Sequence, residues 1–336
     1  MSKIKSLMNK KSFNSSTKVY DQIFKESKWY VKTKLKARGI HDVIAHEFFN
    51  KIKNKDVLDI GCGYGRFSFL VQDYAKSVTG IDRNTQSILV AKDLQKHISN
   101  KSNLEFITSS IEGFKTKKKF DFILLSGTLE HLINTKSIAK KISSLLKRNG
   151  TFVSDSPSEF NSRGLIHGSL WKLFDYPMTL SDVDIITPNK MENIFKKFGI
   201  QINKNCIGTL YSRAWGENAL FDLFERLPNV QKDLHKHNQK MKINNFFDWY
   251  SEGNKYFVEF FNFMIEKKIL KKIKPFKNRN NPIKQKFKSK NINRKEAFDY
   301  MDIDFSIDPY YSVNSTFSKL SGNIIYYGKK INKTWQ

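Results

Sequence analysis

The sequence predicts a doubly wound α/β protein whose sheet has seven strands, mainly parallel. From Asp56 onward, short apolar runs alternate with helical stretches along the chain. This alternation is typical of βαβ units, which place parallel strands in one sheet with right-handed crossovers. A glycine-rich segment, Gly61–Gly65, follows the first apolar run directly. Together these observations predict a Rossmann-like fold.

Each apolar run has the length of a buried strand, and each intervening stretch spaces its apolar residues as a helix does. The predicted strands are Val57–Ile60, Ser77–Ile81, Leu104–Thr108, Phe120–Leu125 and Gly150–Ser154. The predicted helices are Arg66–Tyr74, Thr85–His97 and Thr135–Leu146, after a helical region at 18–50. Lys147 to Gly150 resembles a helix end that runs into a turn, with basic side chains facing the negative end of the helix dipole.

Beyond residue 180 the chain returns to regular structure. Thr187 and Pro188 form a helix start for Asn189–Phe198, and Gln201–Leu210 is typical of another strand. Gly322–Gly328 is the predicted last strand. We therefore expect four parts: a polar and helical segment (1–40), the ligand-binding core (41–212), a helical and basic cap or insertion (213–320), and the terminal strand of the core sheet (321–336).

The charge of the chain is strongly basic and uneven. The 336 residues carry a formal net charge of +27, and thirteen lysines and arginines lie in 267–295 without an acidic residue. Such a run can contact an anionic partner, for example phosphate, anionic lipid or an acidic glycan. It can equally be a solvated surface that reflects an overall bias toward Lys, Asn, Ile and Phe. Both interpretations stay open.

The cysteines and the apolar runs indicate the compartment. Cys62 and Cys206 lie far apart and form no CxxC pair, so the sequence supports neither a disulfide framework nor a cysteine-rich zinc site. Met1–Thr17 is polar and lacks the apolar core of a signal peptide. No uninterrupted apolar stretch of about 18 residues appears, so we expect no transmembrane helix and a cytoplasmic location.

The loop after the first strand carries the clearest chemical signal. Glycines at positions 61, 63 and 65 let the backbone turn sharply and bring main-chain N–H groups close to a ligand. Asp59, at the end of the strand, can accept hydrogen bonds from an ammonium group, and the next helix N-terminus favours a carboxylate. Asp82 closes the second strand, where an acid can bind both hydroxyls of a ribose.

The spacing of the glycines separates this loop from a dinucleotide site. The dinucleotide fingerprint G-x-G-x-x-G would place its third glycine at position 66, which is Arg66 here. The chain instead has G-x-G-x-G with an acid two residues before the first glycine. A nucleoside without a pyrophosphate fits that loop better.

These residues resemble the class I S-adenosylmethionine-dependent methyltransferases, and in particular the group that contains the ubiquinone-biosynthesis O-methyltransferases. The resemblance covers roughly residues 40–210 and implies S-adenosylmethionine as cofactor and S-adenosylhomocysteine as product. It also implies that Gly322–Gly328, the seventh strand, runs antiparallel to the others. It rests on Asp59–Gly65, Asp82, Phe120–Leu125, Leu129–Leu132 and Gly150–Pro157.

The resemblance also implies where the cofactor lies. The loop contacts its methionine end, the acid at the second strand binds its ribose, the loop after the third strand lies near adenine, and the exit of the fourth strand borders the sulfonium. The implied contacts are Asp59, Gly61, Cys62, Gly63, Gly65, Asp82, Arg83, Ser110, Ile111, Leu125 and Ser126. The family often has an acid near adenine, and Ser110 stands here as a weaker partner.

Methyl transfer gains much of its rate from placing the nucleophile in line, and a general base is needed only when the acceptor carries a proton. His131 lies next to the expected methyl position and is the first candidate, with a packing role as its alternative. His167 can reach the same cleft or lie on a surface loop, and Glu130 can orient His131. Asp155 and Glu159 rank after these.

Metal binding and acceptor class complete the expectations. Some relatives bind a divalent cation through E-x-x-E-H, but Gly127 replaces the first carboxylate here, so we expect no bound metal.

The favoured function is methylation of an oxygen or nitrogen on a small-molecule, glycan or lipid-linked acceptor. The alternatives are an RNA methyltransferase that uses the basic appendage, and a cofactor-binding protein without catalysis. Nucleic acid is less favoured because no Pro-Pro-aromatic motif follows the fourth strand.

Overall fold

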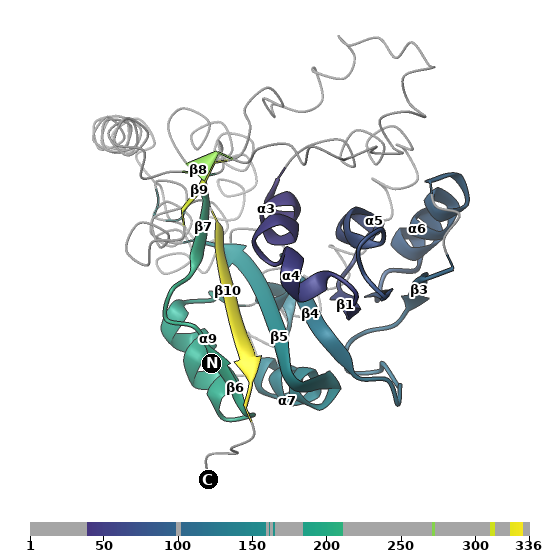
Figure 1. Cartoon of the computed structure of the whole chain (residues 1–336). Helices are drawn as coiled ribbons and strands as arrows, with labels where there is room; N and C mark the ends of the chain where they lie inside the picture. Colours follow the sequence, from purple (N-terminus) through teal and green to yellow (C-terminus); the bar gives the residue numbers. More distant parts are fainter. Residues whose placement is uncertain are drawn as a thin grey trace, which may run out of the picture.

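A ten-stranded mixed sheet runs through the centre of the molecule (Figure 1). The structure is a computed structural model that describes residues 39–98, 102–158, 161, 164, 184–210, 271–272, 310–312 and 323–331. The strands are β1 (Asp56–Ile60), β2 (Ser77–Asp82), β3 (Leu104–Thr108), β4 (Phe120–Ser126), β5 (Leu146–Pro157), β6 (Ile200–Ile202), β7 (Ile207–Leu210), β8 (Lys271–Lys272), β9 (Tyr310–Ser312) and β10 (Asn323–Lys330).

The strand order confirms the predicted fold class. The path is β3-β2-β1-β4-β5-β10-β7-β9-β8, in which β1 to β5 are mutually parallel and β10 runs antiparallel to β5. The order reverses at β1, between β2 and β4, which is the topological switch point where open α/β sheets bind ligands. The carboxyl ends of the parallel strands therefore meet at one edge, opposite the arrowhead of β10 in Figure 1.

The described residues form ten strands rather than the seven expected. The difference comes from one predicted strand that is divided in two and from two short additional strands. The predicted strand Gln201–Leu210 is divided into β6 and β7, which pair one after the other with the same edge of β10. A turn divides them, where Asn205 N–H donates to Asn203 Oδ1 at 2.9 Å. The short strands β8 and β9 extend the sheet beyond β7, inside the segment predicted as a helical cap.

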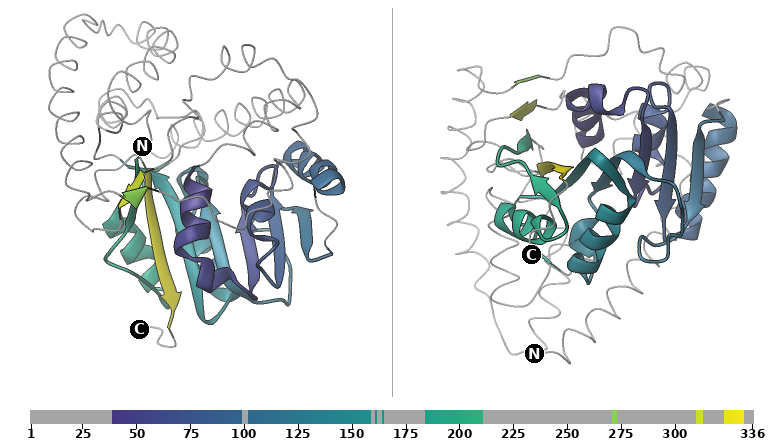
Figure 2. Two further views of the ribbon diagram at one scale, coloured as in Figure 1. Left: turned by 45° about the horizontal axis from the view of Figure 1, so that its top comes forward. Right: turned by 60° about the horizontal axis from the view of Figure 1, so that its bottom comes forward.

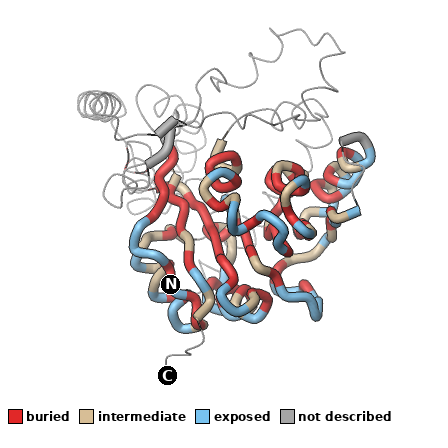
Figure 3. Tube along the Cα trace, viewed as in Figure 1, coloured by how far each residue is buried: buried red, intermediate tan, exposed pale blue. Residues whose placement is uncertain are grey.

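Helices cover both faces of the sheet (Figure 2). One core cluster joins the strands to the helices of the chain's first part, and the other joins them to the later helices. The central strands are buried along most of their length, whereas the helices also carry exposed stretches (Figure 3). Neighbouring strand residues such as Val57 and Leu58 enter opposite clusters because side chains alternate along a strand. The helices are α3 (Ile40–Glu47), α4 (Phe49–Ile52), α5 (Arg66–Val71), α6 (Thr85–Ile98), the 3₁₀ turn η1 (Leu129–His131), α7 (Thr135–Leu145) and α9 (Pro188–Lys196).

Several predictions from the sequence concern residues outside those that the structure describes. The helical region at 18–50 is described only from residue 39, where α3 and α4 confirm its last part. The division of the chain into four parts stays a prediction, because most of 1–40 and of 213–320 lies outside the described residues. Among the residues that are described, no helix is long and apolar enough to cross a membrane.

Lys147 does not act on the helix dipole as the sequence suggested. Helix α7 ends at Leu145, and Asn149 turns the chain with a φ of 60°. Lys147 Nζ instead lies 2.8 Å from both Asp56 Oδ2 and Asp121 Oδ2, at the starts of β1 and β4. Burial alone would raise the pKa of Asp56, but hydrogen bonds from Lys147 and Ser77 and the Lys147 charge lower it to about 2.

Replacing Lys147 with methionine should weaken the fold at neutral pH and flatten its acid response. A carboxyl group with a lowered folded pKa stabilises above its ordinary pKa of about 4, and the contribution is lost as the pH falls toward 2. We expect Lys147→Met to lose about 1–2 kcal/mol at pH 7 and less at pH 3, measured by urea unfolding. The control is Lys118→Met, whose Nζ lies 3.7 Å from Asp56 Oδ1. Equal losses at both pH values would contradict the assignment.

Candidate active site

The glycine loop adopts the conformation that its sequence predicts. The φ angles are 70° at Gly61, 54° at Gly63 and 84° at Gly65. These values lie in the left-handed region, which residues other than glycine rarely adopt. A Cβ on Gly61 would lie 2.4 Å from Thr128 Oγ1, and one on Gly65 would lie 2.4 Å from Phe106 Cζ. A Cβ on Gly63 would meet no atom within 4 Å. The first and last glycines therefore allow close packing, while the middle one faces open space.

Asp59 is a buried acid at the end of β1. Its side chain is 3% exposed, and Ser68 Oγ donates to its Oδ2 at 2.7 Å. Burial raises the pKa of Asp59 to about 7, although the Ser68 hydrogen bond opposes the shift and the Asp82 charge adds to it. A ligand ammonium group nearby would favour the charged carboxylate. The site thus suits a positively charged partner.

Asp82 ends β2 beside this loop and binds it directly. Gly63 N–H donates to Asp82 Oδ2 at 2.9 Å, and Asn84 N–H donates to Oδ1 at 2.8 Å. Burial raises the pKa of Asp82, while these hydrogen bonds and the Arg83 charge oppose the shift. Each carboxylate oxygen can accept a further hydrogen bond, so the acid can hold the loop and two hydroxyl groups of a ligand together.

The other predicted cofactor contacts surround the same edge of the sheet. Ser110 follows β3, and its Oγ accepts the Gly113 N–H at 3.1 Å. The side chain of Ile111 packs into the core, and the Cys62 side chain is buried as well. Leu125 pairs with Ile60 across β4 and β1, and Ser126 is the next residue. These positions stay predictions as ligand contacts.

The predicted catalytic residues divide into two groups. Glu130 and His131 lie on η1, which follows β4 immediately, and Thr128 just before them is the residue that faces Gly61. Glu130 is buried, while His131 is half-buried. His167 lies outside the described residues. The structure therefore brings His131 and Glu130 to the edge that carries the glycine loop, and their roles stay predictions.

Two polar residues at this edge were missed or ranked low in the sequence. His41 Nε2, at the start of α3, lies 2.9 Å from Ser126 Oγ. Asp155, near the end of β5, is the register partner of Ser126 and is 1% exposed. The position of Asp155 at the carboxyl end of a parallel strand was a usable signal. No such signal marked His41 in the sequence, because 85 residues separate it from its partner Ser126.

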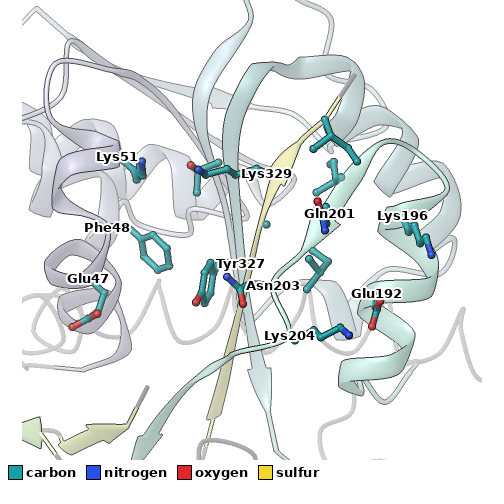
Figure 4. A pocket seen from close by; sticks show the side chains of 15 residues that line it. Glu47, Phe48, Lys51, Glu192, Lys196, Gln201, Asn203, Lys204, Tyr327 and Lys329 are labelled. Atoms are coloured by element: carbon teal, nitrogen blue, oxygen red, sulfur yellow. The ribbon is translucent and has the colours of Figure 1, made fainter. Parts of the chain in front are cut away.

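A concave region lies elsewhere on the molecule. An open groove of about 770 Å³ runs between the end of α3 and the unit formed by α9 and β6 (Figure 4). Phe48, Tyr327 and Gln201 line it, with Lys51 and Lys329 at its rim. None of the residues proposed to contact the cofactor lines this groove.

The polar groups at this edge fit a nucleoside with an amino-acid tail better than a metal ion. Asp59 would suit the ammonium group of the tail and Asp82 the ribose hydroxyls, while the space beside Gly63 leaves room for the ligand. Within the described ranges, no three His, Cys, Asp or Glu side chains gather in a way that could hold a metal. The absence of a bound metal nevertheless stays a prediction.

The fold and the loop thus define a Rossmann-like protein with a site for an adenosine-containing ligand. The sequence profile of the methyltransferase domain family matches residues 51–273. The chain belongs to this family, and with it to the class I S-adenosylmethionine-dependent methyltransferases, whose cofactor is S-adenosylmethionine.

Individual relatives agree with this assignment. The ubiquinone biosynthesis O-methyltransferase of Pelagibacter ubique is 34% identical over 156 residues, which cover 46% of this chain and 64% of that protein. The (S)-tetrahydroprotoberberine N-methyltransferase of Eschscholzia californica is 28% identical over 159 residues, with 44% and 45% covered. The chain thus spans less than two thirds of either relative.

A solved structure, magnesium protoporphyrin IX methyltransferase from Synechocystis PCC 6803 with bound S-adenosylhomocysteine, gives a TM-score of 0.45 at 16% identity. The similarity covers 60% of this chain and 95% of that one.

Proposed function

We propose that the protein transfers a methyl group from S-adenosylmethionine to an oxygen or nitrogen atom of a small-molecule, glycan or lipid-linked acceptor. The observation that carries this proposal is the pair of acids at the ends of β1 and β2, with the left-handed glycine loop between them. Relatives named as O-methyltransferase and N-methyltransferase support both acceptor atoms. The bound cofactor would supply a methyl group on a positively charged sulfur atom.

Each residue of the loop has a proposed task. Asp59 would hold the ammonium group of the methionine end, and the N–H groups at Gly61 and Gly63 would face its carboxylate. Asp82 would accept the ribose hydroxyls while it keeps the loop folded through Gly63 N–H. Adenine would lie near Ser110 and Ile111, with Cys62, Gly65 and Arg83 completing the site.

The acceptor side of the site is proposed at the exit of β4. Leu125 and Ser126 would border the sulfur, and His131 with Glu130, or His167 from the connector, would contact the acceptor. The site would act mainly by orienting the acceptor. The thioether of S-adenosylhomocysteine is a good leaving group, so a correctly placed nucleophile needs little further assistance.

Two proposals concern the surroundings. The buried thiols Cys62 and Cys206, which form no disulfide with each other, support a reducing compartment such as the cytoplasm. The basic run 267–295 is proposed to contact an anionic surface, and only its residues Lys271 and Lys272 are described, as β8.

Calorimetric titration with S-adenosylmethionine and S-adenosylhomocysteine tests the cofactor site. We expect micromolar binding by the natural chain and at least a tenfold weaker affinity in Asp82→Ala, since two charge-assisted hydrogen bonds are worth more than 1.4 kcal/mol. The control is Glu105→Ala, an exposed acid on β3 away from its carboxyl end. Circular dichroism establishes that each variant is folded. Folded natural protein that binds neither compound would overturn the proposal.

A further inference from the structure

The open groove of Figure 4 lies over side chains of three neighbouring strands. Lys329 of β10 is the register partner of both Thr151 on β5 and Gln201 on β6. Register partners point to the same face of a sheet, and so does Tyr327, two residues before Lys329. Tyr327 packs against the core cluster that α3 and α5 share. The groove therefore opens on the face of the sheet that the helices of the chain's first part cover.

The helical layer on this face stops short of the sheet edge. Phe48, between α3 and α4, meets β10 in an edge contact, with its ring centroid 5.4 Å from that of Tyr327. Helix α9, on the other side of the groove, packs its buried side chains into the opposite core cluster. Between these helices, Lys329 and Gln201 are exposed. Sheets of this class carry helices on both faces, so within the described part of the chain the groove is a gap in that layer.

Exposed lysines surround this gap on both sides (Figure 4). Lys51 comes from α4, Lys204 from the turn between β6 and β7, and Lys329 from β10. None of these three forms an ion pair with a residue that the structure describes. Lys196 of α9 lines the groove as well. An occupant with negative charges along its flanks would be attracted from both sides.

Apolar groups line the groove between the lysines. The side chains of Tyr327 and Ile331 are half-buried there, and Phe48 and Ile202 beside them are each 7% exposed. The occupant should therefore be apolar at its centre and negatively charged at its margins. An amphipathic helix has this pattern, because its apolar residues form one stripe and its charged residues lie on either side of that stripe.

Other occupants fit these charges less well. The segment 18–38, predicted to be helical, carries seven basic and two acidic residues, and a second copy of the chain carries the same net charge of +27. Either would bring positive charge to the lysines. A nucleic acid has a phosphate at every nucleotide and would meet Glu47 and Glu192, which also line the groove. Its bases would find no open ring to stack on, because Phe48 is buried against Tyr327.

We propose that this groove is the docking site for an acidic, amphipathic helix of a partner protein. The apolar stripe of that helix packs on Tyr327 and Ile331, in the gap of the helical layer, and carboxylates on its flanks pair with Lys51, Lys204 and Lys329. None of the residues proposed to contact the cofactor lines the groove. The partner and the cofactor therefore bind at the same time, and the inference does not depend on the proposed methyltransferase function.

The test uses a synthetic helix as the probe. It is a fluorescein-labelled peptide of about 18 residues, long enough to form a helix, with leucines at positions i, i+3, i+4 and i+7 and glutamates on both flanks of that stripe. Fluorescence anisotropy measures its binding to the full chain at low salt. We expect a micromolar dissociation constant that changes less than about twofold when S-adenosylhomocysteine is added, because the two sites are separate.

Charge reversal at the groove should weaken this binding. The double variant Lys51→Glu with Lys329→Glu should bind the probe at least about tenfold more weakly, because each change removes an attraction and adds a repulsion. The matched control is Lys92→Glu with Lys140→Glu, which alters the net charge equally at exposed lysines of α6 and α7 outside the groove. The control should bind within about twofold of the natural chain. Circular dichroism establishes that both double variants are folded.

Two further probes distinguish docking from general attraction to a basic protein. One is a peptide of the same composition with its leucines scattered, and the other is single-stranded polyuridine. Equal affinity for the scattered peptide, undiminished binding in Lys51→Glu with Lys329→Glu, or no binding of the helical probe at all would each overturn the proposal. Polyuridine that binds through these two lysines, when the helical probe does not, would make a nucleic acid the occupant instead.

Discussion

Replacing Gly65 with alanine should destabilise the protein by about 2–5 kcal/mol, which combines backbone strain and overpacking. The φ of 84° disfavours any side chain, and the new Cβ would lie 2.4 Å from Phe106 Cζ and 3.0 Å from Phe69 Cε2. Both rings belong to the core between the sheet and α5, so neither can move away freely. Urea unfolding followed by circular dichroism measures the loss.

Gly63→Ala provides the matched comparison. Its φ of 54° adds similar strain, but its Cβ would meet no protein atom within 4 Å, so we expect a loss of only about 1 kcal/mol. The same Cβ would project into the space proposed for the ligand and should weaken S-adenosylhomocysteine binding at least tenfold. The two glycines thus separate a packing role from a ligand role. Equal stability losses in the two variants would contradict this division.

Local patterns explain why the loop was predictable. The strands β1 and β2 end within one residue of their predicted ends. Each apolar run is followed directly by the glycine or acid that ends it, so the sequence itself marks where the strand stops. The positive φ angles of Gly61, Gly63 and Gly65 follow from residue type and spacing alone. The antiparallel direction of β10 was predicted for a different reason, because the resemblance to a known family implied it, whereas its pairing with β5 was not predicted.

Interactions between distant residues account for what the sequence did not predict. Lys147 looked like the end of a helix, yet its ammonium group binds Asp56, 91 residues away, and Asp121. Asp155 ranked low as a catalytic candidate because its neighbours Ser126 and Asn323 come from other strands of the sheet. A periodicity argument cannot find such partners, since register across a sheet is set by the whole fold.

Helix α9 should be as important to stability as the central strands, although it follows a break in the described chain. Phe195 on α9 stacks on Phe152 of β5, with ring centroids 4.5 Å apart and an interplanar angle of 23°. Both side chains are fully buried. Thr187 caps the helix by accepting the Lys190 N–H at 3.3 Å. The stack therefore joins the later part of the chain to the middle of the sheet.

Phe195→Ala should cost about 3–5 kcal/mol, because it removes a buried aromatic ring and leaves a cavity against Phe152. Phe195→Leu should lose less, since it refills part of the volume, and Phe198→Ala should lose less again because that ring is only partly buried. The folded fraction should keep its affinity for S-adenosylhomocysteine, since α9 packs against β6 and α7 rather than the glycine loop. A loss below about 1 kcal/mol, or a separate unfolding transition, would mean that α9 and the β10 edge do not fold cooperatively with β1 to β5.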